Sequence, residues 1–431
     1  MHQEILKMNA SKLQKYILSQ EFSLTLEKLY GAQAVEAQTQ RYQTAVKEFC
    51  QLFGDRDDLH LFSVPGRSEI SGNHTDHNHG KVIAASVDLD IIAVAAPSTD
   101  GVIRVKSEGF PMDSVELGQK ESYPQFTSAA LIAGVVAGME KRGYAVCGFD
   151  AYTTSNVFKG SGLSSSAAFE NMIGTIENHF CNQGTIPFVT ISQISQYAEN
   201  AFFGKPSGLM DQIACAAGGF VGIDFEDPEK PQVQRLDFDL TEKGYALAIV
   251  NTGGNHANLN DDYAGITLEM KAVSQHFGKN YLRELSKEQV LASLPELREK
   301  LGDRAVLRAL HFFNENQRVT RQLNALEQDD LNTFFQCVTE SGRSSLQMLQ
   351  NVYSPAHPEE QGLTLALSLC PEILDADSVW RVHGGGFAGT ILVFVPLNKT
   401  QAFRENIERF FGKGSCFVLR VRTQGALCLT K

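Results

Sequence analysis

The chain is organised around Lys159-Gly160-Ser161-Gly162-Leu163-Ser164-Ser165-Ser166-Ala167-Ala168, where two glycines and a run of three serines precede a helical pattern. Apolar residues recur every three to four positions from Phe169 to Phe180, which predicts a helix. The segment Gly148 to Asn156 before it has the pattern of a strand. Glycines let the backbone approach an anion, and the first N–H groups of a helix have no partner within it. The pattern predicts a phosphate-binding loop.

The same residues have a simpler interpretation, because glycine and serine before a helix often form only a turn and an N-cap. The Walker sequence GxxxxGK followed by Ser or Thr is absent from the chain. A phosphate group here would therefore be bound by a loop of another kind. The motifs elsewhere in the chain decide between the two interpretations.

Length and charge limit the classes of protein to consider. At about 100–200 residues per domain, 431 residues predict two or three domains. A hydrophobic content of 43% and a charged content of 20% are typical of a soluble globular protein. The net charge of −12 argues against a nucleic-acid surface, which needs clustered Lys and Arg. We therefore expect small-molecule ligands, with no nucleic-acid partner.

The cysteines and the hydropathy pattern bear on the compartment. The eight cysteines are scattered, with no CxxC pair, so we expect buried or free thiols in a reducing compartment. Residues 1–26 lack the continuous apolar core of a signal peptide. The most apolar run, 129–139, is too short to span a bilayer. The sequence predicts a cytoplasmic protein without a membrane partner.

The order of elements along the chain indicates two α+β units with a boundary in 224–260. Strand patterns occupy 59–64, 81–97, 102–107, 148–156, 219–224, 233–236, 245–251, 379–382, 390–395 and 416–422. Helical patterns occupy parts of 1–50 and then 123–142, 169–180, 192–203, a segment from 209, much of 261–350, and 399–411. The pattern of 81–97 also allows two strands separated near Val87 and Asp88.

The stretch from Gly72 to Gly80 is too polar for a core and is predicted to be a loop between strands. Its side chains His74, Asp76, His77 and His79 could bind a metal ion. Their alternation, however, does not match the spacing of structural zinc sites. Carboxylate and imidazole groups also hydrogen-bond to hydroxyl-rich ligands, and we favour a polyol site.

Asp211 and Arg67 complete a set of catalytic groups. Alone, each has an ordinary interpretation: Asp211 is a carboxylate at a helix start, and Arg67 is a turn residue after Pro-Gly. Phosphoryl transfer to a hydroxyl, however, needs an anion-binding loop, a cation and a carboxylate near that hydroxyl. The set predicts a small-molecule kinase.

Four motifs in register resemble those of galactokinases within the GHMP kinase superfamily. They are Pro65-Gly66-Arg67 with Gly72-Asn73-His74-Thr75-Asp76, the stretch 160–168, Gly208-Leu209-Met210-Asp211-Gln212, and Gly384-Gly385-Gly386-Phe387-Ala388-Gly389. The resemblance extends over residues 25–431. It implies an α+β fold with an N-terminal mixed-sheet domain (26–240), a ferredoxin-like C-terminal domain (241–431) and the active site between them. Residues 1–25 form an N-terminal extension.

The resemblance implies an ATP-dependent sugar-1-kinase that acts first on galactose and works as a monomer. Asp211 would be the base or electrostatic partner of the O1 hydroxyl, and Arg67 would lower the pKa of that hydroxyl. Ser166 and Glu199 would hold Mg²⁺. The ATP phosphates would bind at Gly160, Ser161, Gly162, Leu163, Ser164, Ser165 and Ser166. The sugar would contact Asn73, His74, Asp76, Gly208 and Tyr263.

The departures from the family concern the sugar. Galactokinases usually carry Glu where this chain has Asn73, Tyr where it has His77, Asn where it has Glu69, and Ile where it has Ser71. A neutral amide could favour a sugar that differs at C6, because a changed hydrogen-bond pairing alters preference strongly. L-Arabinose, galacturonate and N-acetylgalactosamine are the alternatives. A non-catalytic sugar sensor would lack the aspartate or the serine loop, and both are present.

Overall fold

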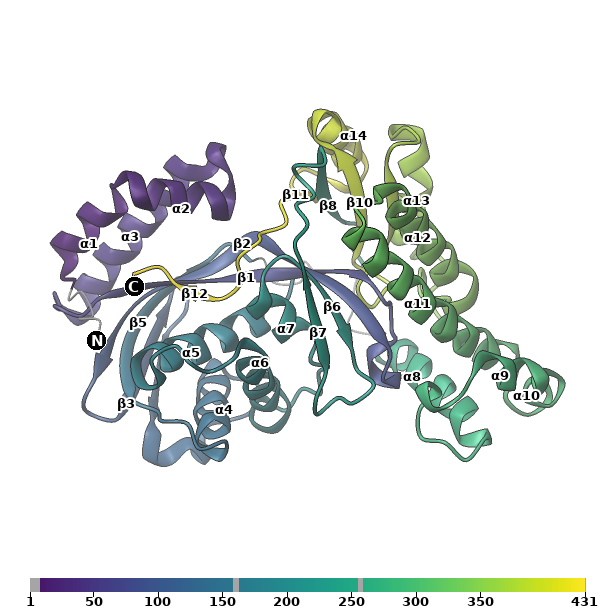
Figure 1. Cartoon of the computed structure of the whole chain (residues 1–431), viewed down its shortest axis with the longest axis horizontal. Helices are drawn as coiled ribbons and strands as arrows, with labels where there is room; N and C mark the ends of the chain where they lie inside the picture. Colours follow the sequence, from purple (N-terminus) through teal and green to yellow (C-terminus); the bar gives the residue numbers. More distant parts are fainter. Residues whose placement is uncertain (1–7, 158–162, 255–258, 431) are drawn as a thin grey trace.

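The computed structural model describes residues 8–157, 163–254 and 259–430, which form two sheets with helices packed on both (Figure 1). The strands are β1 (His60–Ser71), β2 (Lys81–Ser98), β3 (Val102–Ser107), β4 (Met112–Glu116), β5 (Gly148–Ser155), β6 (Phe220–Asp224), β7 (Gln232–Leu236), β8 (Tyr245–Asn251), β9 (Val379–His383), β10 (Thr390–Pro396), β11 (Cys416–Leu419) and β12 (Leu427–Cys428).

The helices form two groups along the chain. The first group is α1 (Ala10–Ile17), α2 (Gln20–Tyr30), α3 (Val35–Phe53), α4 (Ser128–Lys141), α5 (Ser165–Asn182), α6 (Phe188–Tyr197) and α7 (Met210–Ala217). The second group is α8 (Asn260–His276), α9 (Lys287–Ala292), α10 (Leu294–Leu301), α11 (Asp303–Glu327), α12 (Leu331–Ser344), α13 (Gly362–Ile373) and α14 (Thr400–Phe411).

Strand β2 organises the first sheet, whose order is β12-β1-β2-β5-β3-β4, with β6 and β7 added beside β2. Residues 81–85 of β2 pair with β6, and residues 91–98 pair with β5. The allowance for two strands near Val87 and Asp88 is therefore wrong: β2 is continuous, and only its partner changes there. Its Val, Ile and Ala side chains suit a strand that is covered on both faces.

Alternation along the strands places neighbouring residues of the first sheet in different cores. Leu61 packs with Ile92 against α1–α3, whereas the next residue along β1, Phe62, belongs to the core beneath α4–α6. Successive side chains of a strand point to opposite faces, so adjacent residues serve different cores. Within the predicted N-terminal extension, Leu13 and Ile17 of α1 are almost fully buried, so α1 is a packing helix of this layer.

The second sheet is antiparallel, with the order β11-β8-β10-β9. Helices α13 and α14 pack on it through a core that includes Leu363, Phe403 and Ile407. A separate core joins α8 to α11 (Figure 1). The sheet fits the predicted second α+β unit, although α13 and the short strands β4 and β12 were not predicted.

The C-terminal tail returns to the first sheet. After β11 the chain crosses back, and β12 pairs with β1 in the register Phe62↔Cys428 (Figure 1). On the way, Arg422 forms a fully buried ion pair with Asp90 of β2. The predicted C-terminal unit, 241–431, therefore contributes an edge strand to the first sheet.

Two further findings concern the cysteines and the membrane. The structure joins Cys147, just before β5, to Cys181 of α5 in a disulfide. The expectation of free thiols throughout is wrong for this pair, because residues 34 apart in sequence meet only through the packing of α5 on the sheet.

Among the helices of the described residues, none has the length and hydropathy that a bilayer-spanning segment requires.

Candidate active site

The predicted phosphate-binding loop leads into α5, an 18-residue helix. Gly160, Ser161 and Gly162 lie outside the described residues, and the described part of the loop begins at Leu163. The Arg67 N–H donates to the Leu163 carbonyl at 3.1 Å, which ties the loop to β1. A Cβ at Gly66 would lie 2.9 Å from that same carbonyl oxygen, so the close approach requires glycine there.

Arg67 and Asp211 form a bidentate ion pair. Arg67 donates from Nε to Oδ1 at 2.7 Å and from Nη2 to Oδ2 at 2.6 Å. Arg67 Nη2 also donates to the Ser164 hydroxyl at 2.6 Å, and that hydroxyl donates to Asp211. The predicted cation, the predicted carboxylate and a serine of the predicted loop therefore converge on one point.

Asp211 is ionised at neutral pH. Burial alone would raise its pKa, but the charge of Arg67 and the hydrogen bonds from Arg67 and Ser164 outweigh burial and hold the pKa below its usual value. Lys205 lowers it further. A carboxylate with a lowered pKa is a weak base, so Asp211 orients the hydroxyl first and can accept its proton only as bond formation makes that proton more acidic.

Ser166 and Glu199 also meet, as predicted for the Mg²⁺ position. The Ser166 hydroxyl donates to Glu199 Oε1 at 3.1 Å. The carboxylate is almost fully buried, at the start of the π-helical turn η4 (Ala198–Phe203). It also accepts from Lys205 Nζ at 3.0 Å and from Gln212 Nε2 at 2.9 Å. Sequence reasoning missed Lys205 and Gln212 as partners, although Gln212 belongs to a quoted motif.

His74 and Asp76 lie on the loop between β1 and β2, where residues 76–78 form a short 3-10 helix, η2. His74 Nε2 lies 2.8 Å from the Gly385 carbonyl oxygen, which can only accept, so this nitrogen carries the proton. Burial lowers the pKa of His74 to about 4, which keeps the ring neutral and leaves Nδ1 as an acceptor. A Cβ at Gly208 would lie 2.6 Å from Asp76 Oδ2, so glycine makes room for this carboxylate.

The four polar side chains of this loop that were considered as a metal cluster do not group as one. Asp76 pairs with His77, whose Nδ1 lies 3.4 Å from Oδ1. His79 instead stacks on Tyr281. Among the described residues, groups of three close metal-ligating atoms occur elsewhere. The polyol interpretation stays a prediction.

Asn73 is completely buried, and its amide bonds to protein groups. It donates to Glu69 Oε1 at 3.0 Å and to the Gly384 carbonyl at 2.6 Å, and it accepts from Asn351 Nδ2 at 2.8 Å. Glu69 in turn pairs with Arg381 at 3.2 Å. Sequence reasoning missed Arg381 and Asn351 because each becomes a partner only through the contact between the two domains.

Tyr263 packs on the glycine-rich loop 384–389. Its hydroxyl donates to the Gly386 carbonyl at 2.9 Å, and a Cβ at Gly385 would lie 2.7 Å from its ring. The carbonyl of Gly385 also contacts His74, so the loop connects Tyr263 to the polar loop of the first sheet. Three of the predicted sugar contacts, Asn73, His74 and Tyr263, therefore lie against this glycine-rich loop, whereas Gly208 lies against Asp76.

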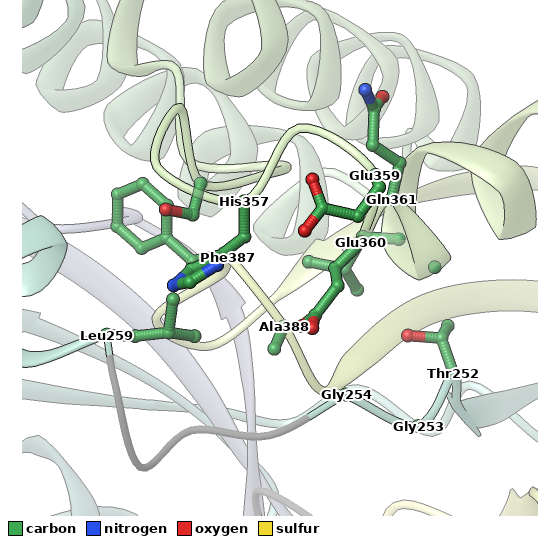
Figure 2. Close-up of a pocket in the computed structure, with 13 residues that line it drawn as sticks. Thr252, Gly253, Gly254, Leu259, His357, Glu359, Glu360, Gln361, Phe387 and Ala388 are labelled. Carbon is green, nitrogen blue, oxygen red and sulfur yellow. The ribbon is translucent and has the colours of Figure 1, made fainter.

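A pocket of about 520 Å³ is bordered in part by the same glycine-rich loop (Figure 2). Phe387 and Ala388 line it together with His357, Glu359 and Glu360. Arg67 and Asp211 do not line it. Two carboxylates disfavour the phosphate groups of a nucleotide, so the chemistry of this pocket differs from that of the Arg67–Asp211 centre.

Asp211 and the start of α5 lie in a segment that matches the GHMP kinases. Residues 130–219 match the family model described as the GHMP kinases N terminal domain. Residues 47–97 match the galactokinase galactose-binding signature.

Curated relatives cover most of the chain. A galactokinase of Glaesserella parasuis is 30% identical over 370 residues, which are 85% of this chain and 92% of that protein. Galactokinases of Streptomyces coelicolor and Homo sapiens are 29% and 28% identical, over 88% and 89% of this chain and 95% and 96% of theirs. The chain belongs to the galactokinase family.

Solved structures show the same fold. The Lactococcus lactis galactokinase complexed with galactose superposes with a TM-score of 0.74 at 23% identity, covering 88% of this chain and 98% of that one. The Methanococcus jannaschii mevalonate kinase superposes with a TM-score of 0.58 at 12% identity, covering 84% and 98%. The expectation of a two-domain GHMP kinase architecture is confirmed.

Proposed function

We propose that the protein is an ATP-dependent galactokinase that transfers the γ-phosphoryl group of ATP to the O1 hydroxyl of galactose. The observation that carries this proposal is the convergence of Arg67, Ser164 and Asp211 on one point at the start of α5. Family membership, including relatives named galactokinase that match over most of their length, supports the substrate.

In this mechanism Asp211 accepts the hydrogen bond of the O1 hydroxyl and orients its oxygen toward the γ-phosphorus. Arg67 lies within hydrogen-bond distance of the same carboxylate, and its charge favours the alkoxide character that develops on the attacking oxygen. The proton of the hydroxyl passes toward Asp211 as the P–O bond forms. ADP leaves as the bond to the β-phosphate oxygen breaks.

The residues present fit Mg²⁺, since Ser166 and Glu199 offer a hydroxyl and a carboxylate oxygen 3.1 Å apart. Mg²⁺ prefers such oxygen ligands. The ion, when bound, neutralises the negative charge of the phosphates. Lys205 shares the Glu199 carboxylate, and its side chain is 59% exposed, so it can move aside as the phosphates arrive.

For the sugar, we propose that His74 Nδ1 and the Asp76 carboxylate accept hydrogen bonds from sugar hydroxyls, with Gly208 leaving room for them. Tyr263 would border the sugar from the second domain. Asn73 contributes through its backbone and by holding the glycine-rich loop, because its amide is already bonded to Glu69, Gly384 and Asn351. We also propose that the protein acts in the cytoplasm, where ATP is made, and as a monomer.

The first experiment measures ADP release with Mg²⁺ and a panel of free sugars: galactose, 2-deoxygalactose, N-acetylgalactosamine, galacturonate, L-arabinose, fucose and glucose. We expect the highest kcat/KM for galactose. A higher kcat/KM for another sugar would support the proposed kinase activity but would show that galactose is not the preferred substrate. No turnover with any sugar, despite ATP binding, would contradict the proposal.

The second candidate is a kinase for a related sugar, and the Glu69–Asn73 pair favours it because the family's usual residues are exchanged here. Asn73→Glu alone would place a second carboxylate about 3 Å from Glu69, with Arg381 as the neighbouring cation, and should destabilise the fold. The double variant Glu69→Asn, Asn73→Glu keeps one negative charge and should fold better.

The sugar preference of this double variant is the informative measurement. If the exchange governs the substrate, the ratio of kcat/KM for galactose to that for the preferred sugar of the wild type rises at least about tenfold. If the exchange is only structural, the ratio is unchanged while both variants differ in thermal stability.

A further inference from the structure

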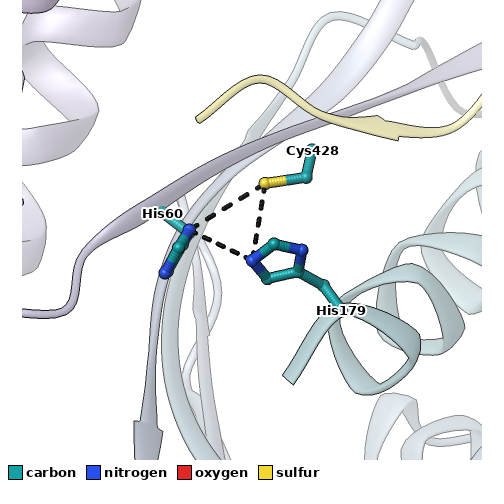
Figure 3. Close-up of side chains that lie close together, drawn as sticks. All are labelled: His60, His179 and Cys428. Atoms are coloured by element: carbon teal, nitrogen blue, oxygen red, sulfur yellow. Dashed lines mark hydrogen bonds between the residues drawn. The ribbon is translucent and has the colours of Figure 1, made fainter. Parts of the chain in front are cut away.

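Three side chains that can ligate metals meet at the edge of the first sheet, outside the active site (Figure 3). His60 begins β1, His179 lies near the C-terminal end of α5, and Cys428 lies in β12. The two histidines are 119 residues apart, and His60 and Cys428 are 368 apart. His60 and Cys428 are buried, whereas His179 is half-buried.

The distances between the three ligand atoms suit one small ion. His60 Nδ1 lies 3.2 Å from His179 Nε2, and Cys428 Sγ lies 4.0 Å and 3.9 Å from these nitrogens. A triangle with these sides has a circumscribed circle of radius about 2.2 Å, so one point lies at that distance from all three atoms. Zinc binds histidine nitrogen at about 2.0–2.1 Å and cysteine sulfur at about 2.3 Å.

We propose that His60, His179 and Cys428 form a zinc site. Imidazole and thiolate are ligands of Zn²⁺, whereas Mg²⁺ and Ca²⁺ take oxygen ligands. Three protein ligands leave one tetrahedral position for water or for the Thr430 hydroxyl. That hydroxyl oxygen lies 3.1 Å from His60 Nδ1 and 3.6 Å from Cys428 Sγ.

Without an ion, the same atoms interact through hydrogen bonds. The facing histidine nitrogens share one, and the Cys428 thiol donates to the Thr430 carbonyl at 3.5 Å. Zinc replaces the protons on the ligand atoms. Each imidazole keeps its proton on the nitrogen that faces away, the thiol releases its proton to water, and Zn–N and Zn–S bonds form.

A second group of ligand-type side chains is formed by Glu177 and Cys181 of α5 together with Cys147, just before β5. Both of its sulfur atoms are joined in the disulfide, so neither can act as a thiolate ligand while that bond is intact. Cys147→Ser, which breaks this pair, distinguishes the two groups in an experiment.

The three ligands belong to three segments that are far apart in the sequence: β1, α5 and the C-terminal tail with β12. Zinc would fasten the C-terminal tail to β1 and to α5, whose first turn carries Ser165 and Ser166 (Figure 1). The proposal does not depend on which sugar is phosphorylated.

The first test uses tag-free protein, stripped with a chelator and titrated with zinc chloride. We expect one zinc per chain, and at least about a 100-fold weaker affinity in Cys428→Ser. Cys370→Ser, at another buried free cysteine, is the matched control and should bind like the wild type, as should Cys147→Ser. Equal affinity in Cys428→Ser and the wild type would overturn the assignment.

The second test uses the half-buried ligand, where a substitution is least disruptive. His179→Gln should fold and should lose the rise in Tm that zinc chloride produces in the wild type. Cobalt should give a thiolate-to-metal absorption band in the wild type and none in Cys428→Ser. An equal rise in the Tm of the wild type and of His179→Gln on addition of zinc would overturn the site. Binding of copper but not of zinc would also overturn it.

Discussion

The ion pairs that Asp90 and Asp211 form with arginine both have a lowered carboxyl pKa, and they differ in how far the carboxylate is exposed to solvent. Asp90 pairs with Arg422 at 3.1 Å and with Arg41 at 2.6 Å, and its side chain is fully buried. Asp211 pairs with Arg67 alone, and its side chain is 29% exposed. In both, the neighbouring cations overcome burial and hold the carboxyl pKa below its usual value.

The difference lies in the remaining hydrogen-bond capacity. Asp90 accepts from two arginines and from the hydroxyls of Tyr30 and Ser63, and its side chain is fully buried, so no solvent-facing acceptor remains. Asp211 accepts from one arginine and one serine, and part of its surface faces solvent. A low pKa alone thus marks an ion pair, whereas a low pKa with free acceptor capacity marks a site that can receive a substrate hydroxyl.

The largest expected effect is on activity, in Asp211→Asn. The amide cannot take the hydroxyl proton and leaves Arg67 without its counter-charge, so kcat should fall by about 10²- to 10⁴-fold. Because the site is partly exposed, the unfolding free energy should fall by less than about 2 kcal/mol. An ADP-release assay and denaturant unfolding measure the two effects. Full activity in this variant would contradict the proposed role.

The same substitution in the fully buried pair, Asp90→Asn, should affect stability rather than activity. It leaves Arg422 buried without its counter-charge and should lower the unfolding free energy by about 3 to 5 kcal/mol. The kcat per folded molecule should change less than about threefold. Asp303→Asn, which removes an exposed ion pair with Arg298, serves as the control and should unfold like the wild type.

The pH dependence separates Asp90 from its near neighbour Asp88. The lowered pKa of Asp90 gives stability that is present above about pH 4 and lost as the pH falls further. Burial raises the pKa of Asp88 to about 6, so the unfolding free energy should fall by about 1 to 2 kcal/mol as the pH rises from 4 to 6. Denaturant unfolding of Asp88→Asn from pH 4 to pH 6 should no longer show this fall in the unfolding free energy. If the unfolding free energy of the variant still falls as much as that of the wild type, a group other than Asp88 causes the fall.

The smallest effect concerns Ser164, which has a φ of 55° and a hydroxyl between Arg67 and Asp211. Ser164→Ala should lower kcat about tenfold by removing that hydroxyl. Ser164→Gly removes the same hydroxyl but suits the left-handed backbone, so it should lose similar activity and be more stable than the alanine variant. Steady-state kinetics and thermal unfolding test both. Equal stability of the two variants would contradict the backbone argument.

Sequence reasoning predicted much of this site because its motifs lie at strand and helix ends. The approach of Arg67 to Asp211 and of Ser166 to Glu199 followed from the motifs and the family resemblance. The burial of Asn73 could not be predicted, since its partners Asn351 and Gly384 are supplied by the second domain. The structure shows which of these side chains meet, whereas the catalytic and binding roles of all of them, Gly160–Gly162 included, stay predictions.

The fold was predicted where periodicity is strong, as in α5, β5 and β10. The strand β12 was missed because its two residues are too few to show an alternating pattern. Its pairing also depends on β1, which is far away in the sequence. The Cys147–Cys181 disulfide was missed for the same reason: only the tertiary packing of α5 brings these residues together. Long-range contacts of this kind leave no local pattern to read.

The return of the tail to the first sheet has a consequence during protein synthesis. Cys428 is made 368 residues after His60, which at about 5 to 20 residues per second is a delay of about 20 to 70 seconds. Until then β1 lacks its edge partner on the ribosome, and unpaired strand edges invite aggregation. The first sheet is therefore the first to be translated and among the last to be completed, and the nascent chain needs protection at this edge throughout that interval.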